Sequence, residues 1–125
     1  MKKNIVILFL VVSGFSFFLP DKKPTIFLIG DSTMANKPLD ENPEKGWGQL
    51  FPKYMTDDVE IQNHAVNGRS TKSFLKEHRW DTVMSRMKAG DYVMIQFGHN
   101  DSKVEDSNRS APAHTLYKEN LIRYI

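Results

Sequence analysis

The sequence predicts an α/β protein, a three-layer α/β/α sandwich built around a parallel sheet. Three apolar runs of strand length alternate with segments whose apolar residues recur at helical intervals, in the order β, α, β, α, β, α. Parallel neighbours need crossover connections, which helices usually provide. The chain of 125 residues is 40% hydrophobic and 26% charged, which is typical of one globular domain. Three strands make a thin sheet, so we expect the sandwich to be incomplete at the C-terminus.

Each element follows from a local pattern. Strands are predicted at residues 25–29, 59–63 and 92–97. The first of these runs is apolar throughout and ends at Gly30, which suits a strand that is buried on both faces. Helices are predicted at residues 49–55, 70–89 and 115–125. Gly90 is a plausible stop for the second helix, and no linker or repeat divides residues 22–125.

Residues 1–20 have the form of a secretory signal peptide. Lys2 and Lys3 precede an apolar run of about fifteen residues, which is shorter than the roughly twenty that a membrane span needs. Phe17, Phe18 and Leu19 do not resemble the small residues of a typical cleavage site, which leaves an uncleaved anchor as the alternative. We expect a secreted or periplasmic protein with no stable membrane partner after cleavage.

Charge and composition exclude several kinds of partner. The formal net charge is +2, and without Lys2 and Lys3 the chain has equal numbers of basic and acidic residues. No basic run is interleaved with aromatic residues, so we expect no nucleic-acid partner. The absence of cysteine excludes disulfides, thiolate metal sites and a cysteine nucleophile. The histidines lack the spacing of a zinc site, so neither a metal nor another cofactor is expected.

Three short loops each begin where a predicted strand ends. Ser32 follows the first strand, and Gly30 lets the chain turn sharply while presenting the hydroxyl. Gly68 follows the second strand, and its backbone N–H can approach a substrate oxygen closely. Asn100 follows the third strand and offers a neutral carboxamide donor. Because parallel strands end at one edge of a sheet, we expect these three residues to converge on an acyl-transfer site.

Each of these residues also has an ordinary structural interpretation. Ser32 would serve as a helix cap, Gly68 as part of a tight turn, and Asn100 as part of an Asn-Asp turn. A nucleotide-binding module is a further alternative for the whole chain. It is disfavoured because no Gly-x-Gly-x-x-Gly or phosphate-loop lysine follows the first strand. The conjunction of the three loops therefore favours an esterase.

The motifs of the chain resemble those of the SGNH (GDSL) hydrolases, specifically the rhamnogalacturonan acetylesterases. They are Gly30-Asp31-Ser32-Thr33, Gly46-Trp47-Gly48, Asn67-Gly68-Arg69-Ser70 and Gly98-His99-Asn100-Asp101. The resemblance covers residues 25–125 and implies an SGNH or flavodoxin-like fold. It implies that Ser32 is the nucleophile and that the N–H groups of Ser32 and Gly68, with the Asn100 side chain, form the oxyanion hole. The substrate would be an acetylated pectic polysaccharide or a small ester, and acetate would leave through an acetyl-enzyme.

The same resemblance implies an Asp-x-x-His segment near the C-terminus, which this sequence does not contain. Without a general base, a serine hydroxyl is a poor nucleophile, so we expect the chain alone to be nearly inert. His64 and His99 follow strands but are more typical of hydrogen-bonding or turn positions, and His78 and His114 have weaker claims. The alternative function is a noncatalytic carbohydrate-binding remnant or an inactive gene fragment.

Arg69 is the basic residue nearest to the predicted oxyanion glycine. A guanidinium at that position could meet the carboxylates of galacturonate. A surface ion pair is an equally ordinary role, so Arg69 is not included in the predicted site.

Overall fold

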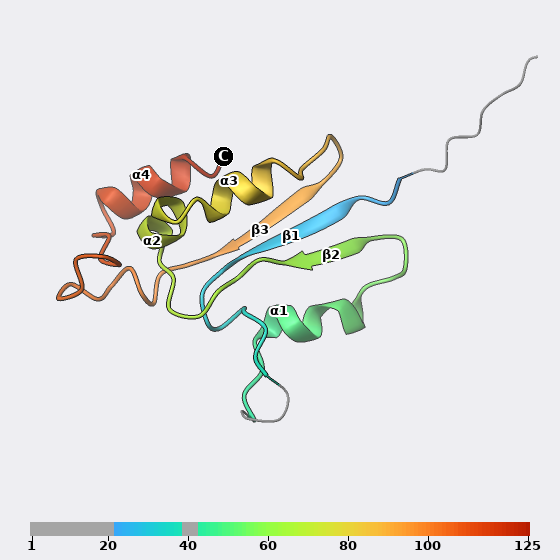
Figure 1. The fold of residues 1–125 in the computed structure, drawn as a ribbon, viewed down its shortest axis with the longest axis horizontal. Helices are drawn as coiled ribbons and strands as arrows, with labels where there is room; N and C mark the ends of the chain where they lie inside the picture. Colours follow the sequence, from blue (N-terminus) through green and yellow to red (C-terminus); the bar gives the residue numbers. More distant parts are fainter. Residues whose placement is uncertain (1–21, 39–42) are drawn as a thin grey trace, which may run out of the picture.

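The computed structural model describes residues 22–38 and 43–125, so the predicted signal peptide lies outside the described residues (Figure 1). Three strands, β1 (Thr25–Gly30), β2 (Glu60–Asn63) and β3 (Tyr92–Gln96), form one sheet in the order β2-β1-β3. Both pairings are parallel, with Ile26 opposite Ile61 on one side and Tyr92 on the other. The predicted parallel sheet is confirmed, with β1 at its centre.

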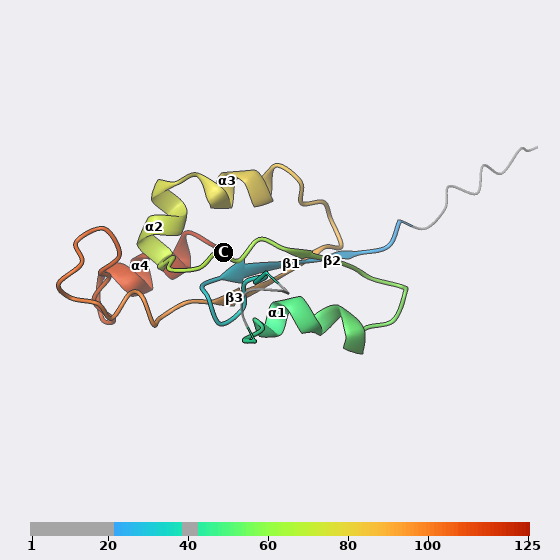
Figure 2. The ribbon, with the colours of Figure 1, turned by 60° about the horizontal axis from the view of Figure 1, so that its bottom comes forward.

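Helices cover both faces of this sheet. They are α1 (Trp47–Leu50), which continues as the 3₁₀ helix η1 (Phe51–Tyr54), α2 (Thr71–Lys76), α3 (Arg79–Met84) and α4 (Leu116–Ile122). Figure 2 shows α1 on one side of the sheet and α2 and α3 on the other. The predicted α/β fold with helices on both faces of a parallel sheet is confirmed.

Alternate side chains of β1 enter two separate cores. Phe27 and Ile29 pack with residues of α2, α3 and the C-terminal segment, including Phe74 and Trp80. Leu28 points to the opposite face and packs with a second group of buried residues, Met34, Ala35 and Ala65. Successive side chains of a strand point to opposite faces, so a strand covered on both faces is apolar throughout. This explains the uninterrupted apolar run that the sequence shows.

The predicted single helix over residues 70–89 is wrong. The chain forms two short helices separated at Glu77 and His78, and His78 adopts a left-handed conformation with a φ of 56°. After this turn, Trp80 and Val83 are buried, and the Trp80 ring lies edge-on to that of Tyr124 at a centroid distance of 5.3 Å. The prediction of one straight helix used only the local spacing of apolar residues. In the structure, the turn at His78 changes the direction of the chain, so that α3 packs against the core.

β3 is covered less completely than β1. Tyr92 is 63% exposed and Met94 is 39% exposed, although Val93 packs against the core that contains Phe27. Figure 2 shows α1 below the sheet. Within the described ranges, no helix is long and apolar enough to cross a membrane.

Candidate active site

The loops that follow the three strands meet at the carboxyl edge of the sheet, where the arrowheads of Figure 1 end. Val66 N donates to Gly30 O at 3.0 Å, which joins the loop after β2 to the end of β1. Asp31 N donates to Gln96 O at 3.3 Å, which joins the loop after β1 to β3. The predicted convergence of loops therefore has a physical basis in hydrogen bonds that continue the sheet past its strands.

Ser32 lies in a tight turn directly after β1. Met34 N and Ala35 N donate to Asp31 O at 3.2 and 3.0 Å, and among the described residues the next helix is α1, which begins at Trp47. No helix begins in residues 33–38, so the alternative interpretation of Ser32 as a helix cap is wrong. Within the described part of the chain, neither the N–H nor the hydroxyl of Ser32 has a hydrogen-bond partner. Ser32 is half-buried.

A buried carboxylate beside Ser32 holds this turn in place. Asp31 is fully buried, and its Oδ1 accepts from Thr33 N at 3.0 Å and from Gln96 Nε2 at 3.3 Å. These contacts tie the turn after β1 to the last residue of β3. The sequence interpretation included Asp31 in a motif but assigned this positioning role to no residue.

Gly68 turns the chain after β2 with a φ of 74°, a conformation that side-chain-bearing residues rarely adopt. Its N–H donates to no acceptor in residues 22–38 and 43–125. Two residues later, Ser70 caps α2, because its Oγ accepts from Ser73 N at 3.1 Å. Gly68 thus lies in a turn, as one alternative proposed, and that turn leaves a backbone donor unpaired.

Asn100 is 2% exposed and contacts the loop that carries Gly68. Its Nδ2 donates to Arg69 O at 3.0 Å, and its Oδ1 accepts from Arg109 Nη1 at 3.2 Å. A carboxamide nitrogen carries two hydrogens, so one N–H of Asn100 stays available. The structure therefore brings Gly68 and Asn100 to neighbouring loops and joins the Ser32 loop to the strand on either side.

Asp101 fastens the Asn100 loop to the start of α2. Its Oδ1 accepts from Thr71 N at 2.9 Å and from the Thr71 hydroxyl. Asn120 Nδ2 donates to the same hydroxyl at 3.0 Å, and Tyr124 Oη donates to Thr71 O at 2.9 Å. Burial raises the pKa of the Asp101 carboxyl, and the hydrogen bonds from Thr71 oppose that rise. The sequence suggested only a turn at Asp101, because its partner lies thirty residues away.

None of the four histidines hydrogen-bonds Ser32 within the described ranges. His64 packs its ring against that of Phe27, with centroids 5.8 Å apart, and its Nε2 lies 3.3 Å from Gln62 Oε1. Burial lowers the pKa of His64, and the positive charge of Arg86 lowers it further. His78 lies at the break before α3, and the side chains of His99 and His114 are exposed. These positions support no assignment of a general base.

Arg69 forms the surface contacts that one alternative anticipated. Its Nε donates to Glu77 Oε2 at 3.1 Å, and its Nη1 donates to Asn67 O at 3.0 Å. The contact of Arg69 with Asn100 is made by its backbone carbonyl, which accepts from Asn100 Nδ2, and its side chain bonds to Glu77 and Asn67 instead.

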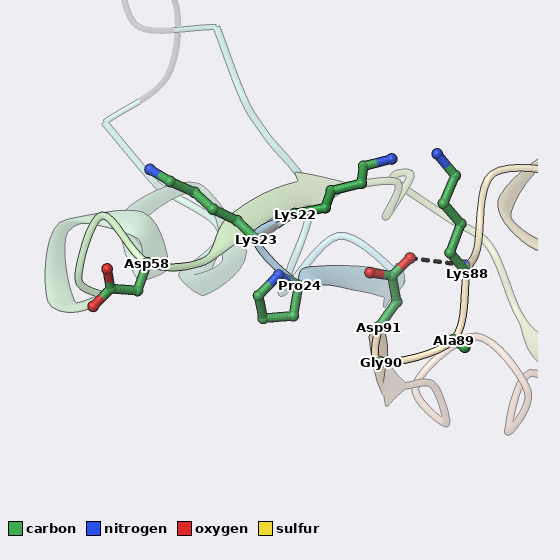
Figure 3. Close-up of a pocket in the computed structure, with 8 residues that line it drawn as sticks. All are labelled: Lys22, Lys23, Pro24, Asp58, Lys88, Ala89, Gly90 and Asp91. Carbon is green, nitrogen blue, oxygen red and sulfur yellow. Dashed lines mark hydrogen bonds between the residues drawn. The ribbon is translucent and has the colours of Figure 1, made fainter. Parts of the chain in front are cut away.

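Two hollows differ in their relation to this edge. One of about 330 Å³ lies beside Gly68 and is lined by polar residues that include Arg69 and Arg109. A larger one of about 650 Å³, shown in Figure 3, lies where β1 and β3 begin, between Lys22, Lys88 and Asp91. It is therefore at the opposite edge from Ser32. Among the residues that the structure describes, no cluster of three potential ligands could hold a metal ion.

The fold is a parallel α/β sheet with helices on both faces, and the loops at its carboxyl edge carry a serine hydroxyl and backbone N–H groups that have no hydrogen-bond partner among the described residues. The chain belongs to the GDSL-like Lipase/Acylhydrolase family, whose model matches residues 28–125.

Curated relatives and a solved structure agree with this membership. The rhamnogalacturonan acetylesterase RhgT of Bacillus subtilis is 47% identical over 83 residues, which cover 66% of this chain and 36% of RhgT. The rhamnogalacturonan acetylesterase of Emericella nidulans is 46% identical over 79 residues, or 62% of this chain and 28% of that protein. The crystal structure of the Bacillus subtilis protein YxiM matches with a TM-score of 0.73 at 29% identity, covering 83% of this chain and 29% of YxiM. The chain thus spans about a third of the length of these proteins.

Proposed function

We propose that this chain belongs to a carbohydrate esterase that removes acetyl groups from rhamnogalacturonan, a pectic polysaccharide, with Ser32 as its nucleophile. The observation that carries the proposal is the set of unpaired groups at the carboxyl edge. The N–H groups of Ser32 and Gly68 lack acceptors in the described part of the chain, and Asn100 Nδ2 has a hydrogen to spare. Unpaired donors at one edge are what a developing oxyanion requires.

The reaction proceeds in two acyl-transfer steps. The oxygen of Ser32 attacks the acetyl carbonyl, its proton passes to a general base, and the carbonyl oxygen becomes an oxyanion held by the three donors. The C–O bond to the sugar then breaks, the sugar oxygen takes the proton, and an acetyl-enzyme forms. Water attacks this ester and releases acetate while the serine regains its proton. The neutral oxyanion hole suits an uncharged ester, because it favours the charge of the transition state over the ground state.

The general base is the part of this mechanism that the chain does not supply. None of its histidines hydrogen-bonds Ser32 in the described ranges, and its length is about a third of that of the matched relatives. We therefore propose that this chain is the N-terminal part of the esterase and that an Asp-x-x-His segment of the longer protein supplies the base. By itself the chain would be nearly inert.

The substrate class rests on the relatives. Two proteins at 46–47% identity carry the name rhamnogalacturonan acetylesterase. The family model matches residues 28–125, a range that includes the loops of Ser32 and Gly68. We propose that the motif residues in these loops have the same roles as in those relatives. We also propose that the protein is exported, because residues 1–20 have the form of a signal peptide; export would bring the enzyme to a polysaccharide outside the cell.

Acetate release tests this proposal directly. The complete gene product is incubated with acetylated rhamnogalacturonan, and Ser32→Ala should lower the rate by about a thousandfold or more, because it removes the nucleophile. Ser102→Ala is the matched control. Ser102 is an exposed serine of a nearby loop whose hydroxyl donates to His99 O at 2.9 Å, and its loss should leave the rate unchanged.

Two outcomes would contradict the proposal. Equal acetate release by wild type and Ser32→Ala would remove Ser32 from the mechanism. Binding of the polysaccharide without any acetate release by the complete product would favour the noncatalytic alternative. The 125-residue chain assayed beside it should release almost no acetate.

A further inference from the structure

Arg109 contacts two of the three loops that carry the proposed oxyanion donors, those of Gly68 and Asn100, although no sequence motif singles it out. Its Nη1 donates to Asn100 Oδ1 at 3.2 Å, and the same atom lies 3.8 Å from where a Cβ on Gly68 would be. Its Nε donates to Asp106 Oδ2 at 2.6 Å in a half-buried ion pair. The guanidinium is therefore anchored at one end and in contact with the site at the other.

These contacts determine which way the Asn100 carboxamide points. A guanidinium can only donate hydrogen bonds, so it selects the oxygen end of the amide. Arg69 O can only accept, so it selects the nitrogen end, at 3.0 Å from Nδ2. Both partners therefore impose the same orientation. The cation on Oδ1 also draws electron density from the nitrogen, which makes its remaining N–H a stronger donor.

We propose that Arg109 is a positioning residue of the oxyanion hole, which holds the Asn100 carboxamide with its nitrogen available to the oxyanion. The inference rests on the proposed function, because that orientation matters for rate only if Asn100 stabilises a transition state. Lysine cannot replace this residue, since a single ammonium lacks the fork that reaches Asp106 and Asn100 from different nitrogens.

Arg79 provides a matched control within the same chain. Its Nε also pairs with a carboxylate, that of Glu77, and its side chain is 35% exposed against 31% for Arg109. Its hydrogen-bond partner among the described residues is Glu77, which also accepts from Arg69 Nε and keeps that bond when Arg79 is truncated. Truncating Arg79 therefore removes a comparable surface ion pair without touching the proposed oxyanion donors.

The first experiment needs no turnover. In ¹⁵N-labelled complete gene product, the side-chain amide resonances of Asn100 should move in Arg109→Ala and stay in place in Arg79→Ala. Arg109 lines the hollow beside Gly68, so added guanidinium ion can reach the vacated position and should restore the resonances. Unmoved Asn100 resonances in Arg109→Ala would overturn the proposal whether or not the protein is an esterase. If Arg109→Ala does not fold, Asp106→Asn keeps the arginine, weakens its anchor, and should move the same resonances.

The second experiment measures acetate release from a small acetyl ester. Arg109→Ala should lower kcat about tenfold to a hundredfold, somewhat less than outright loss of an oxyanion donor, with KM changed less than about twofold. Arg109→Lys should recover little of the rate, and guanidinium should recover part of it. An unchanged kcat in an active enzyme would overturn the positioning role. A wild-type protein with no activity would instead refute the proposed function, and the amide resonances would still decide the orientation of Asn100.

Discussion

At the scale of single residues, the notable feature is backbone donors left without partners. Folded proteins pair nearly all of their buried N–H groups, so an unpaired donor in a partly buried turn suggests a ligand. Ser32 and Gly68 each leave an N–H unpaired within the described ranges, and Gly68 does so in a conformation that favours glycine.

His64 is expected to titrate below pH 6.5, its ordinary value. Burial disfavours the charged imidazolium, and the neighbouring charge of Arg86 acts in the same direction. Because the folded-state pKa is depressed, His64 contributes stability that is present above pH 6.5 and is lost as the pH falls through the folded pKa. An NMR titration of its Cε1–Hε1 signal measures the midpoint.

The reference for that titration is the same signal in the urea-unfolded chain. Arg86→Ala should raise the midpoint of His64 part of the way towards the unfolded value, because it removes the smaller of the two causes. A folded-state midpoint at or above that of the unfolded chain would contradict the prediction.

At the scale of elements, α2 depends on a carboxylate from another loop. The first N–H groups of a helix have no partner within the helix, and here Thr71 N is satisfied by Asp101 Oδ1 while Ser70 caps the next turn. This contact joins α2, the Gly68 turn and the Asn100 loop. The loops of Gly68 and Asn100, two of the three that carry proposed oxyanion donors, are therefore held together through the N-terminus of α2.

Two variants, Asp101→Asn and Asp101→Ala, should show whether stability depends on the hydrogen-bond acceptor at position 101 or on its negative charge. Asn keeps an oxygen that can accept from Thr71, so it should cost little. Ala leaves the buried donors of Thr71 unpaired and should lower the free energy of unfolding by about 2–3 kcal/mol. Urea unfolding at neutral pH measures both changes. A smaller loss for Ala than for Asn would contradict the assignment.

The pH dependence gives a further readout of the same residue. The folded-state pKa of Asp101 is raised, so its contribution to stability is complete below its ordinary value of 3.8 and is lost as the pH rises through the folded pKa. As the pH rises from about 4 to about 7, the wild type should therefore lose stability relative to Asp101→Asn, whose amide does not titrate.

At the scale of the whole molecule, the two faces of the sheet are covered unequally from strand to strand. β1 is buried on both faces, whereas β3 is at the edge of the sheet in the described part of the chain and exposes Tyr92 and Met94. Leu28 and Met94 are register partners on neighbouring strands, yet Leu28 is 0% exposed and Met94 is 39% exposed. The position of a residue in the sheet, more than its type, therefore decides how deeply its side chain is buried and how much that burial stabilises the fold.

Leu28→Ala should lower the unfolding free energy of the 125-residue chain by about 3 kcal/mol, since it removes a fully buried side chain from the α1 face. Met94→Ala should cost about 1 kcal/mol, because much of that side chain already contacts water. Urea unfolding curves of the two variants measure the difference. Equal costs would show that both positions are equally buried in solution.

The sequence by itself determined the strands, their parallel arrangement and the loops in which Ser32, Gly68 and Asn100 lie, because apolar runs and strand-end loops are local patterns. It failed where long-range contacts compete with local ones. The predicted helix over residues 70–89 breaks at His78, and this break lets Trp80 pack in the core. Only the tertiary structure decided which partners orient the site, since Arg109 meets Asn100, and Asp101 meets Thr71, through contacts that no spacing in the chain encodes.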